Sequence, residues 1–407
     1  MMTFPHAPSR REVLAGSGAL FAWANLPRLA HAEGRDPRFL TIILRGALDG
    51  LATVAPVGDP DWIALRGDNA LRFGGAVPPL QLDSFFALNP AMPSLHRMFQ
   101  AKEAIVVHAC ATPYRERSHF DGQDLLESGL PQPAPSESGW LNRAVYGLAS
   151  SGRVDPAGSA KALGVGPALP LVVRGPAPVL TWSPQGAPPA SEDTVRRLRD
   201  LYRHADVKLA HVMDEDAKLA AVEPMGNMQR PAGNQPRVYF AEVAAMAADI
   251  LAQPNGPRVG ALALDGWDTH NNEGIAAGRL AQLLGSLDGA IASVKANMGP
   301  AWLETVVVVA TEFGRTARIN GTDGTDHGTA TVALLAGGAL KGGRVIADWP
   351  GLKPANLYEN RDLAPTTDLR AALKGVLRDH LRVDDRALAE TVFPGSKNVK
   401  PLIGLMG

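Results

Sequence analysis

The sequence predicts an α/β protein with a largely parallel central sheet. Apolar runs of strand length recur at residues 38–44, 104–110, 259–264 and 305–310. An amphipathic helical pattern over residues 278–298 separates the last two runs. Strand, helix and strand in that order predict a parallel crossover connection. Polar clusters of Asp, Glu and His follow the strands, where ligands bind in open α/β sheets.

Residues 1–32 have the features of an export signal. Arg10 and Arg11 precede an apolar stretch over residues 13–26, and Ala32 ends a small-residue cleavage site. Paired arginines are typical of the twin-arginine pathway, whose export machinery is then an expected partner. An ordinary secretory signal or an N-terminal helix is the alternative. We expect residues 33–407 to form a single periplasmic or secreted domain.

Composition excludes some classes of function. The 40 basic residues balance 41 acidic ones, which argues against nucleic-acid binding because that needs a concentrated positive surface. No run after the signal approaches the roughly 20 apolar residues that span a bilayer, so we expect no stable membrane insertion. Cys110 is the single cysteine, which excludes an intramolecular disulfide and a Cys-based zinc site, and we expect it in the core.

The first predicted strand ends in the sequence RGALDG, which contains Arg45 and Asp49. Asp-Gly is a common turn pair, so Asp49 is either a turn residue or a ligand at a strand end. Arg45, Arg115 and Arg315 are candidates for binding an anionic ester, because a guanidinium group matches two oxygens of such an anion. For each of them a structural ion pair is the alternative.

The second predicted strand is followed by TPYRERSHFDGQDLLESG, with a helix expected from about Phe120. Ser118 or Asp121 is suited to cap that helix. At a helix N-terminus the backbone N–H groups and the helix dipole favour an anion, so Ser118 is also a candidate nucleophile. His119 and Arg115 lie in the same turn, which favours a site there.

Residues 150–235 carry no recognisable catalytic pattern. Their first part is rich in Pro, Gly and Ala, and a charged helical pattern follows from Ser191. We predict a cap or insertion region.

Three polar clusters suggest a metal site. Asp268 and His270 follow one strand, Glu312 follows the next, and Asp326 and His327 precede another apolar run. Each pair alone is an ordinary surface feature, but their repetition at strand ends favours a site for one or two divalent ions. Mixed oxygen and nitrogen ligands favour zinc or manganese, with magnesium or calcium as alternatives.

Several motifs together carry a family resemblance: RGALDGL, PYRERSHFDGQDLLESG, GWLNRA, GWDTHNN, TEFGRTARING, GTDHGTA and DLAPTTDLR. They resemble the bacterial, commonly twin-arginine-exported family catalogued as domain of unknown function 1501 (DUF1501), over nearly the whole chain after the signal. That family is similar to the alkaline phosphatase and sulfatase superfamily. The superfamily combines a mixed sheet, two metals and a Ser, Thr or modified Cys nucleophile at a helix start.

The resemblance implies roles for individual residues. Ser118 would be the nucleophile. Metal-ligand roles would fall on Asp49, Asp268, His270, Glu312 and His327. Phe313 stands where the superfamily has a ligand histidine, which implies one metal, a compensating ligand such as His119 or Asp326, or a site without catalysis.

The combined expectation is an alkaline-phosphatase-like, exported, metal-dependent hydrolase that acts on a small anionic ester of phosphate or sulfate. The alternative is a periplasmic binding or assembly protein that keeps the fold without catalysis.

Overall fold

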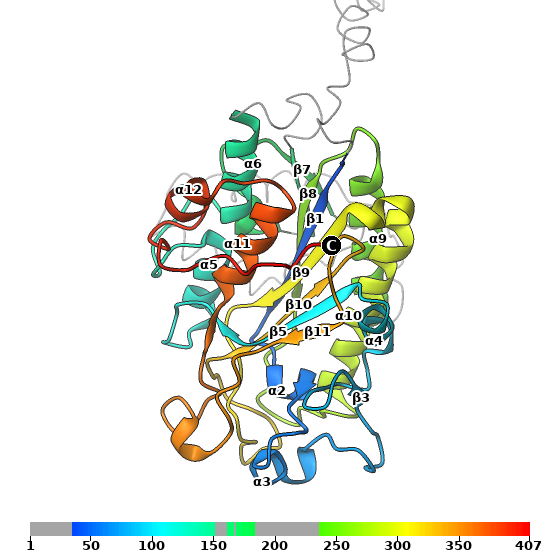
Figure 1. Cartoon of the computed structure of the whole chain (residues 1–407), viewed down its shortest axis with the longest axis vertical. Coiled ribbons are helices and arrows are strands. Elements are labelled where there is room, and N and C mark those ends of the chain that lie inside the picture. Colours follow the sequence, from blue (N-terminus) through cyan, green and yellow to red (C-terminus); the bar gives the residue numbers. More distant parts are fainter. Residues whose placement is uncertain (1–34, 151–160, 167, 184–235) are drawn as a thin grey trace, which may run out of the picture. The chain divides into compact units, whose positions relative to one another are not determined.

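The computed structural model describes residues 35–150, 161–166, 168–183 and 236–407, and the fold is that of Pro37–Gly407 (Figure 1). Its main strands are β1 (Arg38–Arg45), β5 (Ala104–Ala111), β6 (Ala162–Val165), β7 (Val179–Trp182), β8 (Val259–Asp265), β9 (Thr305–Thr311), β10 (Thr331–Ala336), β11 (Arg344–Ile346) and β12 (Thr367–Asp368). They form one nine-stranded sheet in the described part of the chain, in the order β11-β5-β10-β9-β1-β8-β6-β7, with β12 also beside β5.

The direction of the strands confirms the predicted fold class. Among the described strands of this sheet, the antiparallel pairings are those of β10 with β5 and β9, and the other pairings are parallel. The strands β8 and β9 both pair with β1, so the crossover through the helix between them is parallel, as the sequence predicted. The protein therefore has an α/β fold with a mixed, mostly parallel sheet.

Helices cover both faces of the sheet (Figure 1). One layer contains α5 (His119–Ser128), α6 (Trp140–Ser150) and α11 (Leu369–Asp379), and the other contains α4 (Pro93–Gln100), α9 (Pro236–Ala252) and α10 (Arg279–Met298). Shorter elements are α2 (Gly50–Thr53), α3 (Trp62–Arg66), α12 (Asp385–Ala387), the 3-10 turns Gly67–Asn69, Leu171–Val173, Gly299–Glu304 and Pro354–Asn356, and the π turn Leu388–Val392. The strands β2 (Val54–Ala55), β4 (Ala87–Leu88) and β3 (Leu80–Gln81) form a small antiparallel sheet.

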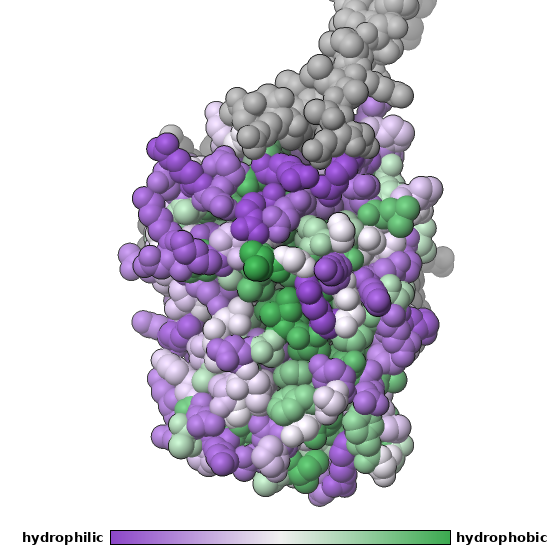
Figure 2. All heavy atoms as spheres, in the orientation of Figure 1, coloured by the Kyte–Doolittle hydropathy of each residue, from purple (hydrophilic) through white to green (hydrophobic). Residues whose placement is uncertain are grey.

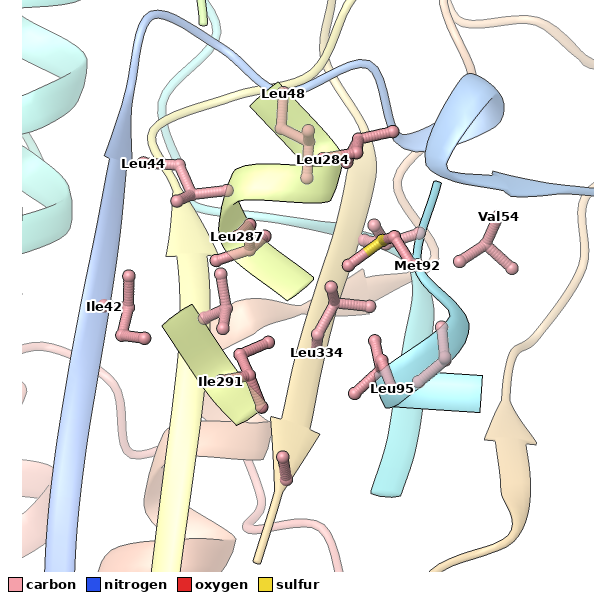
Figure 3. Close-up of a cluster of buried hydrophobic side chains, with 14 of the residues drawn as sticks. Ile42, Leu44, Leu48, Val54, Met92, Leu95, Leu284, Leu287, Ile291 and Leu334 are labelled. Atoms are coloured by element: carbon pink, nitrogen blue, oxygen red, sulfur yellow. The ribbon is translucent and has the colours of Figure 1, made fainter. Parts of the chain in front are cut away.

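The strand β1 supplies both hydrophobic cores. Ile42 and Leu44 pack in the core beneath α4 and α10, whereas Phe39 and Ile43 pack in the core beneath α6 and α11. This division follows from the alternation of side chains along a strand. Figure 3 shows Ile42 and Leu44 facing Leu287 of α10. Burial on both faces explains why the strand is a continuous apolar run in the sequence.

The surface in the view of Figure 2 is largely hydrophilic at its margins, with hydrophobic residues gathered along its middle. Cys110 is buried, as the sequence predicted. Among the helices that the structure describes, none has the length and apolar character needed to cross a membrane.

The predicted cap needs a correction. Within residues 150–235, β6 and β7 are strands of the central sheet, since β6 pairs with β8 and β7 pairs with β6. The helix predicted from Ser191 lies outside the described residues, as does the predicted signal.

Candidate metal centre

Three neighbouring strands bring the polar clusters together. The last residues of β8 and β9 lie in register with the end of β1, Asp265 beside Arg45 and Thr311 beside Leu44. Because these strands are parallel, the loops that follow them leave the same edge of the sheet. That edge faces α2 in Figure 1. The segments carrying Asp268 and Glu312 therefore start side by side.

His119, the first residue of α5, is held by a carboxylate. Its Nδ1 lies 2.8 Å from Oε1 of Glu312, and its ring stacks on Phe313 with 5.1 Å between ring centres. Since a carboxylate accepts hydrogen bonds, Nδ1 carries the proton and Nε2 of the neutral ring keeps its lone pair. That Nε2 lies 3.6 Å from Oδ2 of Asp268. The hydrogen bond to Glu312 raises the pKa of His119.

Glu312 is fully buried and surrounded by donors. Oε1 also accepts from the backbone N–H of Gly46 at 2.8 Å and from Gln123 at 3.1 Å, and Oε2 accepts from the hydroxyl of Thr311 at 2.7 Å. Although burial opposes it, the hydrogen bond from His119 and those of its other donors hold the pKa of Glu312 below its ordinary value. Glu312 is therefore an ionised anchor for the ring of His119.

His327 is held by a backbone carbonyl. Its Nδ1 lies 2.9 Å from the carbonyl oxygen of Arg117, so Nδ1 donates and Nε2 keeps its lone pair. That Nε2 lies 3.5 Å from Oδ1 of Asp268. Burial and the neighbouring His119 lower the pKa of His327, which favours the neutral ring that a metal requires.

His270 completes the group. Its Nδ1 lies 3.3 Å from Oδ1 of Asp326, and its Nε2 lies 3.1 Å from Oδ1 of Asp268. The hydrogen bond from Asn320 lowers the pKa of Asp326, so this carboxylate is a ready acceptor. The Nε2 atoms of His270 and His327 are 2.9 Å apart. Two ring nitrogens at this distance need a proton or a cation between them, because their lone pairs repel.

Asp268 is the residue on which these imidazoles converge. The buried guanidinium of Arg315 donates to its Oδ1 at 2.7 Å. Although partial burial opposes it, Arg315 holds the pKa of Asp268 below its ordinary value. This contact leaves Oδ2 directed towards His119. The carboxylate is therefore ionised and already oriented without a metal.

The ligand atoms of His119, Asp268 and His327 all lie within 4.8 Å of one another. Each of the three imidazoles has its Nδ1 at an acceptor, and this is how protein side chains orient metal-binding histidines. Two or three imidazole nitrogens with one carboxylate oxygen suit zinc, among other transition metals. The residues thus fit a single divalent ion.

A model of the family described as "Protein of unknown function (DUF1501)" matches residues 36–392. The chain belongs to the DUF1501 family. No curated protein matches this DUF1501 sequence.

Solved structures that are similar to the DUF1501 chain include the following three. One is a protein in the alkaline phosphatase superfamily from Vibrio parahaemolyticus (13% identity, 97% of this chain and 80% of that chain, TM-score 0.38). Another is the phosphonate monoester hydrolase of Agrobacterium radiobacter (13%, 76% and 70%, TM-score 0.32). The third is the C-terminal periplasmic domain of EcEptC from Escherichia coli in complex with Zn (10%, 77% and 77%, TM-score 0.35). TM-scores of this size mark a distant likeness, from which no chemistry passes to this chain.

The DUF1501 structure brings together Asp268, His270 and His327, whose role as metal ligands stays a prediction. It places Glu312 and Asp326 differently, because each contacts the Nδ1 of a histidine on the side away from Asp268. In this arrangement the two acids orient imidazoles, and the ligand role expected of them stays a prediction.

Asp49 is a further correction. Arg66 of α3 donates to both of its carboxylate oxygens, at 2.6 and 3.0 Å, and the pair is buried. Oδ1 also accepts from the backbone N–H of Ala52 and so caps α2. The structure therefore supports the turn interpretation of Asp49, whose two carboxylate oxygens pair with an arginine.

Ser118 is the N-cap residue of α5, next to His119. Its backbone N–H donates to the hydroxyl of Tyr114 at 3.1 Å. Among the described residues, its side chain makes no capping hydrogen bond to the helix, so its hydroxyl is not committed to that role. Ser118 as nucleophile stays a prediction.

The three candidate arginines have structural partners. Arg45 pairs with the buried carboxylate of Glu127 at 2.6 Å. Arg115 donates to the backbone carbonyl of Tyr114 at 2.7 Å, and burial lowers its pKa. Arg315 likewise pairs with Asp268, so the ion-pair alternative is favoured for Arg45 and Arg315. Arg115 is held by a backbone carbonyl instead of an acid.

Sequence reasoning did not single out Glu273 or the carbonyl of Arg117. A backbone oxygen leaves no trace in a sequence. Glu273 lies in the same motif as Asp268 and His270. An acid in a loop is ordinarily solvated, so nothing in the sequence indicated that Glu273 is buried.

Proposed function

We propose that this protein is an exported hydrolase of phosphate or sulfate esters that depends on one divalent metal ion. The observation that supports the proposal is the convergence of three imidazoles, each fixed at Nδ1, on the ionised carboxylate of Asp268. An arrangement that directs several lone pairs towards one point is typical of a metal site.

A divalent ion held by His119, Asp268 and His327 would polarise an ester oxygen as a Lewis acid. The protein's own groups prepare the rest of the site. Ser118 would attack phosphorus or sulfur through its hydroxyl oxygen, the bond to the leaving alcohol would break, and the proton released by the hydroxyl would balance the one that the alcohol takes up. Water would then hydrolyse the seryl ester. The N-terminus of α5 favours the anionic group at this place.

A non-catalytic binding or assembly protein is the second candidate. Arg315 supports it, because the ion pair with Asp268 neutralises that carboxylate without a metal. Phe313 supports it as well, since this residue packs with Tyr114 and beneath His119 where the superfamily has a ligand.

Metal content tests the two candidates. Residues 33–407 would be purified without chelator as wild type, His327→Ala, Asp268→Asn and the control His96→Ala, which removes a histidine of α4. The hydrolase proposal expects about one equivalent of transition metal in wild type and control, and loss in the other two. Metal-free wild type from metal-replete cells would contradict it and favour the binding protein.

Activity is the next measurement. Wild type and Ser118→Ala would be compared on a panel of phosphate and sulfate esters. We expect Ser118→Ala to lose turnover while it keeps its metal and its melting temperature. A fully active Ser118→Ala would remove the nucleophile from the proposal.

Export by the twin-arginine route would be tested by replacing Arg10 and Arg11 with lysine and following the protein by cell fractionation.

A further inference from the structure

Two loops carry four residues of the centre, and their backbones lie against each other. The loop after β8 holds Asp268 and His270, and residues 320–328 hold Asp326 and His327. The N–H of Asn272 donates to the carbonyl of Thr322 at 2.9 Å, that of Glu273 to Asp323 at 2.8 Å, and that of Thr325 to Thr269 at 3.1 Å. The relative position of the two loops therefore sets the distances from Asp268 and His270 to Asp326 and His327.

Gly324 shows how close this approach is. A Cβ atom at this position would lie 2.1 Å from the carbonyl oxygen of His270. No side chain fits there without separating the loops. The same carbonyl accepts from Asn320 at 2.9 Å and from the hydroxyl of Thr322 at 3.0 Å. The backbone beside His270 is thus held by residues of the second loop.

One buried side chain is hydrogen bonded to both loops. Glu273 is 0% exposed, and its carboxyl oxygens are hydrogen bonded to the hydroxyls of Thr269 at 2.7 Å and Thr325 at 3.2 Å. Thr269 lies between Asp268 and His270, and Thr325 directly precedes Asp326. Both threonines are also fully buried. One carboxyl group thus contacts a neighbour of the ligands on each loop.

A buried carboxyl group needs interactions that compensate for the loss of water. Burying it costs free energy unless its oxygens are hydrogen bonded. The charged groups that face it are Asp49, Arg66 and Arg315, and the nearby Asp49 makes a second negative charge unfavourable. Burial and Asp49 raise the pKa of Glu273 to about 8, so at neutral pH the group is a neutral acid that can both donate and accept.

We propose that Glu273 is a positioning residue that joins the two ligand-bearing loops through Thr269 and Thr325 and thereby sets the metal affinity of the centre. The inference rests on the proposed function, because it concerns the same metal. It is separate from catalysis, since Glu273 touches neither the ligand atoms nor the position expected for substrate. Groups that orient metal ligands change affinity by about 10- to 100-fold when they are removed.

The test compares metal affinities by titration of zinc against a chromophoric chelator. Glu273→Ala removes both hydrogen bonds, whereas Glu273→Gln keeps the shape and the ability to donate and accept. Thr269→Val and Thr325→Val each remove one hydroxyl and leave the acid in place. Asp288→Ala is the matched control, because Asp288 is a buried acid that bonds the backbone N–H groups of Ser94 and Leu95 away from the centre. Melting temperatures are recorded for every variant.

We expect Glu273→Ala to bind zinc about 10- to 100-fold more weakly than wild type, with each valine variant intermediate and Glu273→Gln close to wild type. Asp288→Ala should lose thermal stability and keep wild-type affinity. If Glu273→Ala does not fold, the valine variants decide. Wild-type zinc affinity in the valine or alanine variants, or an equal loss in Asp288→Ala, would overturn the positioning role and leave the metal site standing. Wild type without zinc binding would overturn both.

Discussion

His119 depends on the charge of one neighbour, because its Nδ1 faces the buried carboxylate of Glu312 at 2.8 Å. Glu312→Gln keeps the size of that neighbour and removes its charge. We expect the pKa of His119 to fall, since the interaction with Glu312 is what raises it. We also expect metal affinity to fall by about 10- to 100-fold.

Imidazole NMR of the metal-free protein would follow the pKa of His119, and chelator competition would follow the affinity. Glu359→Gln is the control, because Glu359 is an exposed acid that pairs with Arg117. An unchanged pKa of His119 in Glu312→Gln would show that the ring does not depend on this carboxylate.

Glu273 makes stability depend on pH. Its pKa rises from 4.5 to about 8 in the folded protein, chiefly through burial. The folded state therefore holds the proton more tightly than the unfolded chain, so this stabilisation is complete below about pH 4.5 and is lost as the pH rises through about 8. We expect wild type to lose stability relative to Glu273→Gln over this range, in urea unfolding at several pH values. A difference that stays constant with pH would contradict the raised pKa.

The helix α4 begins with help from another helix. Asp288 of α10 accepts from the backbone N–H groups of Ser94 at 3.0 Å and Leu95 at 2.7 Å. Asp288→Ala leaves those N–H groups without their acceptor, and we expect the free energy of unfolding to fall by about 1–3 kcal/mol. Asp288→Asn keeps an acceptor oxygen and should cost less. Urea unfolding measures both, and equal losses would show that capping is not the role of Asp288.

The elements differ in how well the sequence predicted them. Strands buried on both faces, such as β1 and β9, are continuous apolar runs and were predicted. The strand β7 lies at the edge of the sheet and is partly exposed, and β6 has only four residues. Both lie in a Pro- and Gly-rich segment, so neither gave a recognisable strand pattern. The two-residue strands of the small sheet carry too little pattern to be recognised.

The sequence indicated which residues lie near the candidate site, but not their contacts. Polar residues after strands indicated Asp268, His270 and His327, because parallel strands bring such residues to one edge. Which atom each side chain faces depends on tertiary partners. Arg66 decides the role of Asp49 from a separate helix, and no local pattern links them.

The whole domain shares one sheet between two cores. Ile42 and Ile43 are neighbours in β1, yet Ile42 is buried with α10 and Ile43 with α11. Truncating either to alanine leaves a cavity in a fully buried layer, and we expect each to lower the free energy of unfolding by about 2–5 kcal/mol. Because both helix layers pack on the same strand, loss of one core should remove the support of the other.

Denaturant unfolding of Ile42→Ala and Ile43→Ala would test this coupling. Tryptophan fluorescence reports on both cores, since Trp302 belongs to the first and Trp140 to the second. Circular dichroism reports on all helices. We expect both probes to give one transition, shifted to lower denaturant in both variants. A variant in which fluorescence and dichroism separate into two transitions would show that the layers unfold independently, and that the central strand does not couple them.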